Sequence, residues 1–372
     1  MYKGMIGING TILGPRPSGL GVYAKHMIEE LDRQGIDFIL YTSYADGLAL
    51  SEKNRKRIHK TEISVAPLDK GKHFLRHVWL QFFLPLLLRR HGVSVLLNLV
   101  PEGPLFTRTA QVTVVHDLIP LLSRRGHFLQ RLNFRVLVPP LLKRSVSVVT
   151  DSEAVKKDLI RLFKIKPEKI HAIPLAFDAR RFRPSDPQEA KTKFGLNRYF
   201  IYVGNILPHK NISSLIEAFG KAVPGSGHTL VIAGHKDRRY LPFLRDSIGK
   251  NALEKKVVFL DYVPDNDLPS LISGADALVL PSFFEGFGLT CLEAMACGCP
   301  VVSSELSSVR EACADAAVYF DPDDPDELAL ILKRLSKDKD MRLSLKEKGL
   351  ERSGHFSWEK CGMSLSNIIR NI

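Results

Sequence analysis

The chain has 372 residues, of which 45% are hydrophobic and 25% are charged. This length and composition favour a soluble globular protein with two domains. Its most apolar stretch, residues 78–88, is shorter than the roughly 20 residues of a membrane-spanning helix and is broken by Gln81 and Pro85. Five cysteines form no disulfide framework or zinc-site pattern, and the N-terminus has no signal-peptide pattern. We therefore expect reduced thiols in a cytoplasmic protein.

The positive charge is confined to the first half of the chain. Residues 1–183 carry 30 Lys and Arg against 15 Asp and Glu, a net charge of +15. Residues 184–372 carry 23 against 25, a net charge of −2. The first half should therefore prefer an anionic partner, such as a lipid headgroup, a pyrophosphate or a nucleic acid. A generally basic proteome is the alternative explanation, but the asymmetry favours a functional cause.

Short apolar runs alternate with helical periodicity through both halves, which predicts βαβ units and parallel sheets. In the first half we expect a helix whose buried face carries Leu20, Ala24, Met27, Ile28 and Leu31, and strands at 5–9, 38–42, 93–99, 112–117 and 146–152. In the second half we expect strands at 199–206, 229–235, 257–263 and 277–282, and helices at 213–223 and 267–275. Proline and charge near 180–190 predict the linker, so the predicted domains are 1–183 and 184–355, followed by a C-terminal helix at 356–372 that packs back on the first domain.

The most informative stretch is "PSFFEGFGLTCLEAMACGCPVV", residues 281–302. A strand ends at Pro281, a glycine loop follows at Gly286 and Gly288, and a helix begins at once. Such a loop lets the backbone approach a ligand, and a helix N-terminus offers unpaired N–H groups to a phosphate. Glu285 and Glu293 lie on either side and could each hold vicinal sugar hydroxyls. The alternative is an exposed loop charge and a solvated helix residue.

Three further segments follow the same strand, loop and helix pattern. Lys210 follows Gly204 in "YVGNILPHKN", where an ammonium could neutralise a pyrophosphate or simply be solvated. His116 ends the strand of "TVVHDLIPLL" and is either functional or a hydrogen-bonded structural histidine. Gly19 and Gly21 in "RPSGLGVYAKHMIEEL" leave a helix start, capped by Ser18, open to a phosphate or sugar, although the dinucleotide fingerprint spacing is absent.

The acidic segment at residues 321–327 could suggest a metal site. Its carboxylates precede an amphipathic helix, whose N-terminus they stabilise. We interpret them as helix caps and expect no metal ion or other cofactor.

Together these motifs resemble the retaining glycosyltransferases of family 4, which have the GT-B fold of two facing, doubly wound Rossmann-like domains with an interdomain cleft. The resemblance is nearly continuous from "YVGNILPHKN" through "EGFGLTCLEAMACGCPVV" to "AAVYFDPDDPDELA" and "FSWEKC". In the first half it depends on "SGLGVYAKHMIEEL", "VVHDLIPLL" and "VTDSEAVKKDLIRLFKI".

The resemblance implies a role for each residue of a donor site. Glu293 would hold the ribose and Glu285 the transferred sugar, while Lys210 would bind the diphosphate. His116 would reach the donor sugar from the first domain. The remaining implied donor contacts are Gly19, Gly21, Gly204, Asn205, Tyr262, Val263, Gly286, Phe287, Gly288 and Leu289. Asn205 stands where many relatives have an arginine, so Lys210 has less help unless His209 or a cation of the first domain contributes.

The implied reaction is metal-independent transfer of a hexose, with retention, from a nucleotide sugar to a hydroxyl of a glycan. "HDLIPL" and "PHKN" look most like relatives that use GDP-mannose, although UDP- and dTDP-linked donors occur on the same scaffold. The basic and apolar segment 73–90, with "KNRKRIHK" at 53–60, predicts peripheral binding to the inner, anionic membrane face and a lipid-linked acceptor, as in bacterial O-antigen and lipopolysaccharide assembly. Core packing of that helix is the alternative.

Two other classes of protein remain as alternatives. A nucleotide-sugar epimerase with the same fold would act on the donor without an acceptor. A basic nucleic-acid-binding protein would explain the charge, but the sequence has neither interleaved aromatics nor a known binding module, so we expect no nucleic-acid partner.

Overall fold

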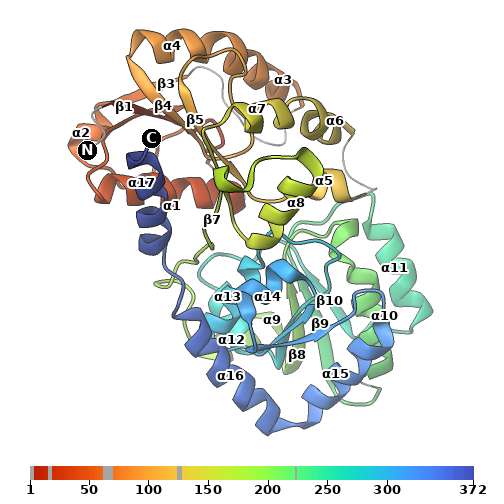
Figure 1. The fold of residues 1–372 in the computed structure, drawn as a ribbon. Coiled ribbons are helices and arrows are strands. Elements are labelled where there is room, and N and C mark those ends of the chain that lie inside the picture. Colours follow the sequence, from red (N-terminus) through yellow and green to blue (C-terminus); the bar gives the residue numbers. More distant parts are fainter. Residues whose placement is uncertain (1–3, 16–18, 62–69, 124–127, 223) are drawn as a thin grey trace. The chain divides into compact units, whose positions relative to one another are not determined.

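The computed structural model describes residues 4–15, 19–61, 70–123, 128–222 and 224–372. These residues form two compact units (Figure 1), one made of residues 1–175 with 358–372 and the other of residues 176–357. Each unit is a parallel β-sheet with helices packed on it, which confirms the predicted α/β class. No helix in the described ranges is long and apolar enough to cross a bilayer.

The first unit has a seven-stranded sheet in the order β3-β2-β1-β4-β5-β6-β7. Its elements are β1 (Met5–Asn9), α1 (Gly19–Arg33), β2 (Phe38–Thr42), α2 (Glu52–Arg55), β3 (Ile58–Lys60), α3 (Lys70–Val78), the π-helix η1 (Trp79–Phe83), α4 (Leu84–Arg90), β4 (Val93–Asn98), β5 (Ala110–Val115), α5 (Ile119–Leu122), α6 (Phe128–Val136), α7 (Val138–Arg144), β6 (Ser147–Thr150), α8 (Glu153–Phe163), the 3-10 helix η2 (Pro167–Lys169), β7 (Ile170–Ala172) and α17 (Trp358–Arg370).

The second unit has a six-stranded sheet in the order β10-β9-β8-β11-β12-β13. Its elements are α9 (Pro187–Phe194), β8 (Arg198–Val203), the 3-10 helix η3 (Pro208–Lys210), α10 (Ile212–Ala222), β9 (His228–Ala233), α11 (Leu241–Lys250), β10 (Val257–Leu260), α12 (Leu268–Ser273), β11 (Ala277–Leu280), α13 (Leu289–Ala296), β12 (Val301–Ser304), α14 (Ser307–Cys313), β13 (Ala317–Phe320), α15 (Pro325–Lys337) and α16 (Lys339–Ser353).

All strand pairs are parallel, and the central strands are buried on both faces. This explains why they are continuous apolar runs instead of alternating ones. Each sheet has one switch point, where the chain reverses the direction in which it adds strands: between β1 and β4 in the first unit, and between β8 and β11 in the second. Ligands of doubly wound sheets bind outside the carboxyl ends of the strands at such a point.

The C-terminal helix α17 belongs to the first unit, where it lies beside α1 (Figure 1). The two helices approach closely, since a Cβ on Gly362 would stand only 2.2 Å from Cγ of Glu30. The thiol of Cys361 donates to the carbonyl of Pro174, 3.0 Å away. The end of the chain is thereby attached to the domain that the first residues build.

The units divide between Leu175 and Ala176, earlier in the chain than the expected boundary at 183/184. The intervening residues pack in the second unit because Phe182 is buried and Arg181 donates to the Asp265 carboxylate at 2.8 Å. Leu20, expected on the buried face of α1, is exposed at the first turn of that helix. Ser18, the expected cap of this helix, lies outside the described residues.

Candidate active site

The loops after β8 and β11 bring a lysine and a glutamate of the second unit together at its switch point. Lys210 ends η3 after β8, and Glu285 lies in the loop after β11. Lys210 Nζ lies 2.7 Å from Glu285 Oε1, and both side chains are largely buried. The backbones are joined as well, since the amide of Phe283 donates to the carbonyl of His209. Two segments 75 residues apart in the sequence therefore form one site.

The loop after β8 depends on a close approach between two backbones. Gly204 and Gly234, which follow the adjacent strands β8 and β9, have φ angles of 149° and 141°. A Cβ on Gly234 would stand 2.0 Å from the carbonyl oxygen of Gly204, so a larger residue cannot occupy this position without a backbone shift. Beyond this crossing, Tyr202 donates its hydroxyl hydrogen to the carbonyl of Asn205 at 2.9 Å and so holds the turn that leads to Lys210.

Glu285 is fixed by hydrogen bonds that leave one of its carboxyl oxygens open. Ser282 donates to Oε1 at 2.6 Å, and Lys210 donates to the same oxygen. Ser308, from α14, donates to the backbone carbonyl of Glu285 at 2.8 Å. Among the described residues, Oε2 has no protein partner, so it can accept a hydrogen bond from a ligand hydroxyl.

The N-terminus of α13 begins directly after this carboxylate. Gly288, its N-cap, has a φ of 95°, in the left-handed region that favours glycine, and its Cα faces the side chain of Val309. Phe287 is buried and packs edge-on against Phe356, with ring centroids 5.9 Å apart. The first backbone amides of this helix follow Glu285 closely in the chain, and a helix N-terminus stabilises an anion.

Glu293, one turn into α13, is partly buried, and burial raises the pKa of its carboxyl from 4.5 to about 8. Arg181 opposes this rise and Asp265 adds to it. Arg181 donates to both the backbone carbonyl and the side chain of Asp265, which attaches the loop after β10 to the start of the unit. A carboxyl group with a pKa of about 8 is largely neutral at pH 7, where an ordinary surface glutamate is ionised, and such perturbed groups are candidates for functional positions.

Lys210 is the positive side chain of this loop at neutral pH. Burial and the neighbouring Lys210 ammonium lower the pKa of His209 to about 4, so its imidazole is neutral. His209 therefore does not supply a second positive charge beside Lys210. The sequence had left this role open for His209, because Asn205 stands where many relatives have an arginine. The side chain of Asn205 itself is exposed.

In the first unit, His116 lies directly after β5 and is buried with both ring nitrogens hydrogen bonded. Nε2 donates to the carbonyl of Leu99 at 3.0 Å, and Nδ1 lies 2.8 Å from Oδ2 of Asp151. Burial alone would lower the pKa of His116, but the Asp151 carboxylate raises it above its ordinary value. The ring of Tyr23 packs against it edge-on. Burial likewise raises the pKa of the Asp151 carboxyl, so His116 and Asp151 form a buried, hydrogen-bonded pair in this unit.

Two family models match the chain, one to each half. Residues 17–181 match the model "Glycosyltransferase Family 4", and residues 186–352 match "Glycosyl transferases group 1". O-antigen chain mannosyltransferase B of Escherichia coli is 31% identical over 268 residues, which is 70% of each chain. The protein belongs to the group 1 glycosyltransferases.

Other relatives and solved structures agree with the assignment of this chain to the glycosyltransferases. O-antigen chain mannosyltransferase RfbU of Salmonella typhimurium is 33% identical over 227 residues, and the match spans 61% of each chain. Among solved structures, Anabaena Alr3699/HepE in complex with UDP and glucose has a TM-score of 0.77 at 18% identity, with 99% of both chains covered. WaaG, a glycosyltransferase involved in lipopolysaccharide biosynthesis, has a TM-score of 0.74 at 17% identity, covering 98% of this chain and 99% of that one. These structures confirm the predicted GT-B fold.

Apart from Asn205, Glu293 and His116, which are described above, the sequence-predicted residues of this glycosyltransferase fall into three groups. The second unit brings together Lys210, Glu285 and the Gly286–Gly288 loop, with Leu289 opening α13 and Gly204 in the preceding loop. Tyr262 and Val263 lie beyond the end of β10, the first exposed and the second buried. Gly19 and Gly21 open α1 in the first unit, where a side chain on Gly19 would meet open space.

Reasoning from the sequence missed three supporting residues. Ser282 and Ser308 donate hydrogen bonds that orient Glu285. The positive charge of Arg181 acts on Glu293 and opposes the rise of its pKa. Ser282 could have been noticed because it stands three residues before the glutamate. Ser308 and Arg181 carry no sequence signal, since only the fold brings them near.

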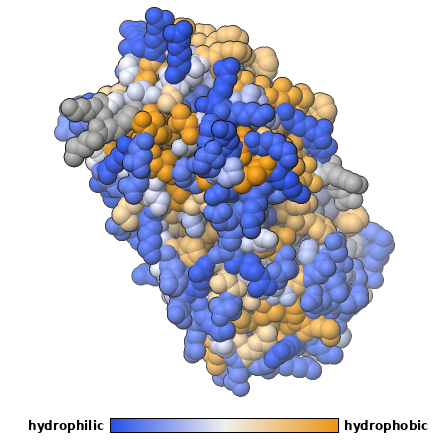
Figure 2. All heavy atoms as spheres, in the orientation of Figure 1, coloured by the Kyte–Doolittle hydropathy of each residue, from blue (hydrophilic) through white to orange (hydrophobic). Residues whose placement is uncertain are grey.

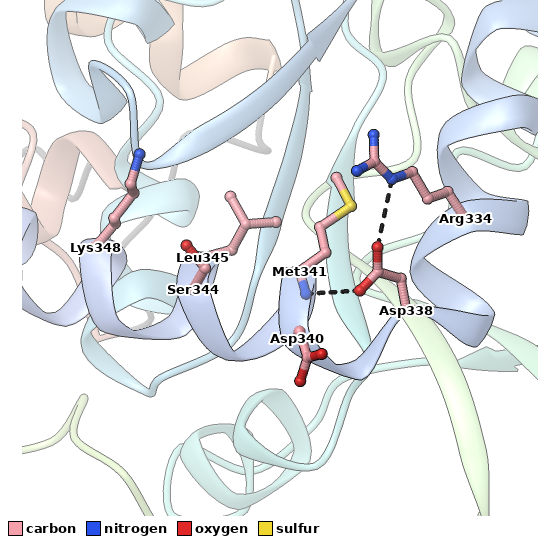
Figure 3. A pocket seen from close by; sticks show the side chains of 7 residues that line it. All are labelled: Arg334, Asp338, Asp340, Met341, Ser344, Leu345 and Lys348. Atoms are coloured by element: carbon pink, nitrogen blue, oxygen red, sulfur yellow. Dashed lines mark hydrogen bonds and ion pairs between the residues drawn. The ribbon is translucent and has the colours of Figure 1, made fainter.

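Two acidic side chains late in the second unit cap helices. The acids at 321–327 act as predicted: Asp324 caps α15 by accepting hydrogen bonds from the amides of Asp326 and Glu327. Between α15 and α16 lies an open hollow of about 520 Å³ (Figure 3). There Asp338 pairs with Arg334 and accepts from the amide of Met341, so it caps α16. In the described part of the chain, no three His, Cys, Asp or Glu side chains cluster as metal ligands.

Proposed function

We propose that this glycosyltransferase moves a hexose from a nucleotide sugar to a hydroxyl of a lipid-linked glycan, with retention of anomeric configuration and without a metal ion. Mannose from GDP-mannose is the donor that we propose first. The observation that carries the proposal is the Lys210–Glu285 pair beside the N-terminus of α13, at the switch point of the second sheet.

The diphosphate would bind beside Lys210 and the N-terminus of α13. Lys210 supplies an ammonium, and the amides of Gly288 and Leu289 supply aligned dipoles. The backbone at Gly204 and Asn205 would border the same phosphates, because that loop ends at Lys210. Charge that develops on the leaving diphosphate is then neutralised by groups already in place, which is the role a metal ion would otherwise have.

The two glutamates would hold hydroxyls on either side of the diphosphate. Glu285 can accept from the hexose through Oε2, since Oε1 is held by Ser282 and Lys210. Glu293 would hold the ribose as a carboxylate, with the nucleobase beside the exposed ring of Tyr262 and the backbone of Val263. The backbone of Gly286 and Phe287 would line the sugar and phosphate between them.

The proposal also gives donor-binding roles to residues of the first unit. Gly19 and Gly21 open α1 without a side chain that blocks its N-terminus, which suits an approaching phosphate or sugar. His116 would face the hexose, and a hydrogen bond from it to the sugar would have to replace its bond to Leu99 or Asp151.

Retention would follow from attack on the face that the leaving group vacates. In the absence of donor, the Lys210 ammonium pairs with the Glu285 carboxylate. The diphosphate of the donor would compete with Glu285 for this ammonium. The released carboxylate would then hold the sugar while the glycosidic bond breaks through an oxocarbenium-like state. Rate acceleration would come from orientation and from stabilisation of the leaving group.

The names of relatives support mannose and the type of acceptor. The Escherichia coli and Salmonella typhimurium proteins are named for transfer of mannose to O-antigen chains. A UDP-linked donor is the second candidate, since a neighbour of the same fold is described in complex with UDP-glucose, and a dTDP-linked donor is the third. An epimerase is the rival reaction, and it would consume donor without any acceptor.

The test is turnover of GDP-mannose, UDP-glucose and a dTDP-sugar with a lipid-linked saccharide acceptor, in buffer that contains a chelator. We expect transfer from GDP-mannose alone, with the proton spectrum of the product giving the same anomeric configuration as the donor. Inverted product or a requirement for divalent metal would refute the mechanism. Conversion of the donor without acceptor would favour the epimerase.

A further inference from the structure

The first unit exposes an unusual concentration of apolar side chains on one helical layer. The continuous helix α3-η1-α4 exposes Phe74, Leu75, Phe82, Phe83 and Leu86, and α6 exposes Phe128, Leu129, Leu132 and Val136. With Phe106, these make up ten of the 19 large apolar side chains that are exposed in the described part of the chain. We call these ten residues the apolar face. Figure 2 shows apolar surface along the edge that α3 and α4 form in Figure 1.

The α3-η1-α4 helix is apolar on both its sides. Trp79, Leu80, Leu84 and Leu88 point into the core of the unit and are buried. Core packing, the alternative to membrane binding that the sequence left open, therefore explains this side of the helix. It does not explain the opposite side, where Phe74, Phe82 and Leu86 are 70%, 64% and 67% exposed. Patches of this kind mark interaction sites on soluble proteins.

Helix α6 repeats the pattern. None of its residues is buried, yet Phe128, Leu129, Leu132 and Val136 recur at the spacing of one helix face. Phe128 is 74% exposed. Phe134, elsewhere on α6, packs partly buried against the core of the unit, whereas every member of the apolar stripe is exposed.

The helices that carry the apolar face lie on the same side of the sheet. The crossovers from β3 to β4 and from β5 to β6 run in the same direction along the strand order, so right-handed connections put α3-η1-α4 and α5–α7 on one side. Contacts agree with this. Gln81 of η1 exchanges hydrogen bonds with Gly103 and Leu105, and Arg144 of α7 donates to the carbonyl of Leu105.

The segment that carries the apolar face is also the source of most of the chain's positive charge. Residues 70–144 contain 12 Lys and Arg against 2 Asp and Glu, a net charge of +10 out of +13 for the chain. One of the two acids, Glu102, forms a nearly buried ion pair with Arg76. Arg89, Arg90 and Arg135 remain exposed beside apolar residues. In an isologous dimer through this face, two segments that each have a net charge of +10 would meet. Their mutual repulsion disfavours such a dimer.

We infer that the apolar face docks on an anionic lipid bilayer. Aromatic and leucine side chains that project outward enter the headgroup boundary of a bilayer, and neighbouring arginines bind anionic headgroups. The inference deepens the lipid-linked acceptor of the proposed function and rests on it for its biological purpose. Docking through α3-η1-α4 and α6 holds the first unit against the surface where such an acceptor resides.

The test measures co-flotation of the full chain with vesicles of phosphatidylcholine alone and of phosphatidylcholine mixed with phosphatidylglycerol, at physiological salt. We expect binding to the anionic vesicles only. The triple variant Phe74→Ser, Phe82→Ser, Leu86→Ser should reduce the partition coefficient at least about tenfold, because each side chain contributes buried apolar area. Phe243→Ser, an exposed residue of α11 in the second unit, is the matched control and should bind as the original chain does.

A second pair of variants separates the electrostatic part. Arg89→Gln with Arg90→Gln should lower binding about tenfold or more and flatten its dependence on salt, whereas Lys333→Gln with Lys337→Gln on α15 should not. Absence of binding to anionic vesicles overturns the inference, and so does unchanged binding of the triple variant. A dimer in solution that the triple substitution dissociates would also overturn it, by assigning the face to a protein partner. Thermal stabilisation by GDP needs neither an acceptor nor a vesicle, so failure here is distinguishable from failure of the proposed reaction.

Discussion

Glu293 should release a proton when the nucleotide sugar binds. Its pKa in the ligand-free protein is about 8, because the carboxyl is buried, whereas a carboxylate that accepts two ribose hydrogen bonds must be ionised. About one molecule in ten is ionised at pH 7, and each pH unit below the pKa costs about 1.4 kcal/mol of binding free energy. Affinity should therefore rise about fifty-fold between pH 6 and pH 8.

The assay is calorimetric titration with an intact nucleotide sugar, whose two phosphates do not titrate in this range. In two buffers with different ionisation enthalpies at pH 7, the difference should give release of about 0.9 proton for each ligand bound. Glu293→Gln is the control, since it keeps the shape of the side chain without its charge, and its weaker binding should be independent of pH. Wild-type binding without proton release, or an equal pH dependence in the variant, would refute the assignment of Glu293 to the ribose.

The same pKa predicts a stability effect of known sign. A pKa raised from 4.5 to about 8 means that the folded protein favours the protonated carboxyl. Its contribution to stability is complete below about pH 4.5 and is lost as the pH rises through 8. At pH 8.5 Glu293→Gln should therefore be more stable than the original chain by a few kcal/mol in urea unfolding, and the difference should shrink toward pH 5. A variant that is less stable at pH 8.5 would contradict the buried position of this carboxyl.

Three further predictions concern single side chains. Glu285→Gln should lower kcat at least about tenfold while KM for the donor changes little, because the carboxylate acts on the hexose in the transition state. A raised KM with an unchanged kcat would contradict this. Gly288→Ala should destabilise the protein by about 1–3 kcal/mol in urea unfolding, because φ is 95°, whereas Gly249→Ala on α11 should not; equal effects would remove the conformational argument. His116→Ala should cost about 3–5 kcal/mol of unfolding free energy because it leaves a buried carboxylate unpaired, and a loss below about 1 kcal/mol would contradict the buried pair.

The strands of both sheets were accessible from the sequence because they are buried on both faces. Runs such as "VSVLLNL" and "ALVL" have no polar alternation, and glycine or proline follows them, so both their type and their ends are marked. The edge strands β3 and β7 were missed, since each has three residues and includes exposed or polar side chains. Strands β12 and β13 were not assigned, although "VVSS" and "AVYF" are short runs that only their pairing distinguishes from loop.

The donor site was predictable at the level of its loops and not at the level of its contacts. Gly204 and Gly288 both have positive φ, as loops that approach a ligand closely require. The pairing of Lys210 with Glu285 could not be deduced from spacing, because it depends on β8 and β11 being neighbours at the switch point. The partial burial of Glu293 was equally hidden, since a glutamate within a helix is exposed more often than not.

His116 illustrates a limit of another kind. Its position after a central strand fitted both a ligand contact and a structural role, and the sequence could not decide between them. The structure gives its imidazole two partners from neighbouring strand ends, Leu99 and Asp151. Those partners are distant in sequence, so the hydrogen bonding could be known only from the fold.

The most direct test of the account is thermal stabilisation by GDP, UDP, dTDP and ADP at equal concentration, with a chelator present. A ligand that binds only the folded state raises its melting temperature. We predict a clear rise with GDP that disappears in Lys210→Met and persists in the control Lys221→Met, whose ammonium pairs with exposed carboxylates on α10 and α15. A rise that needs added divalent metal, or one that Lys210→Met retains in full, would contradict a diphosphate site built on Lys210.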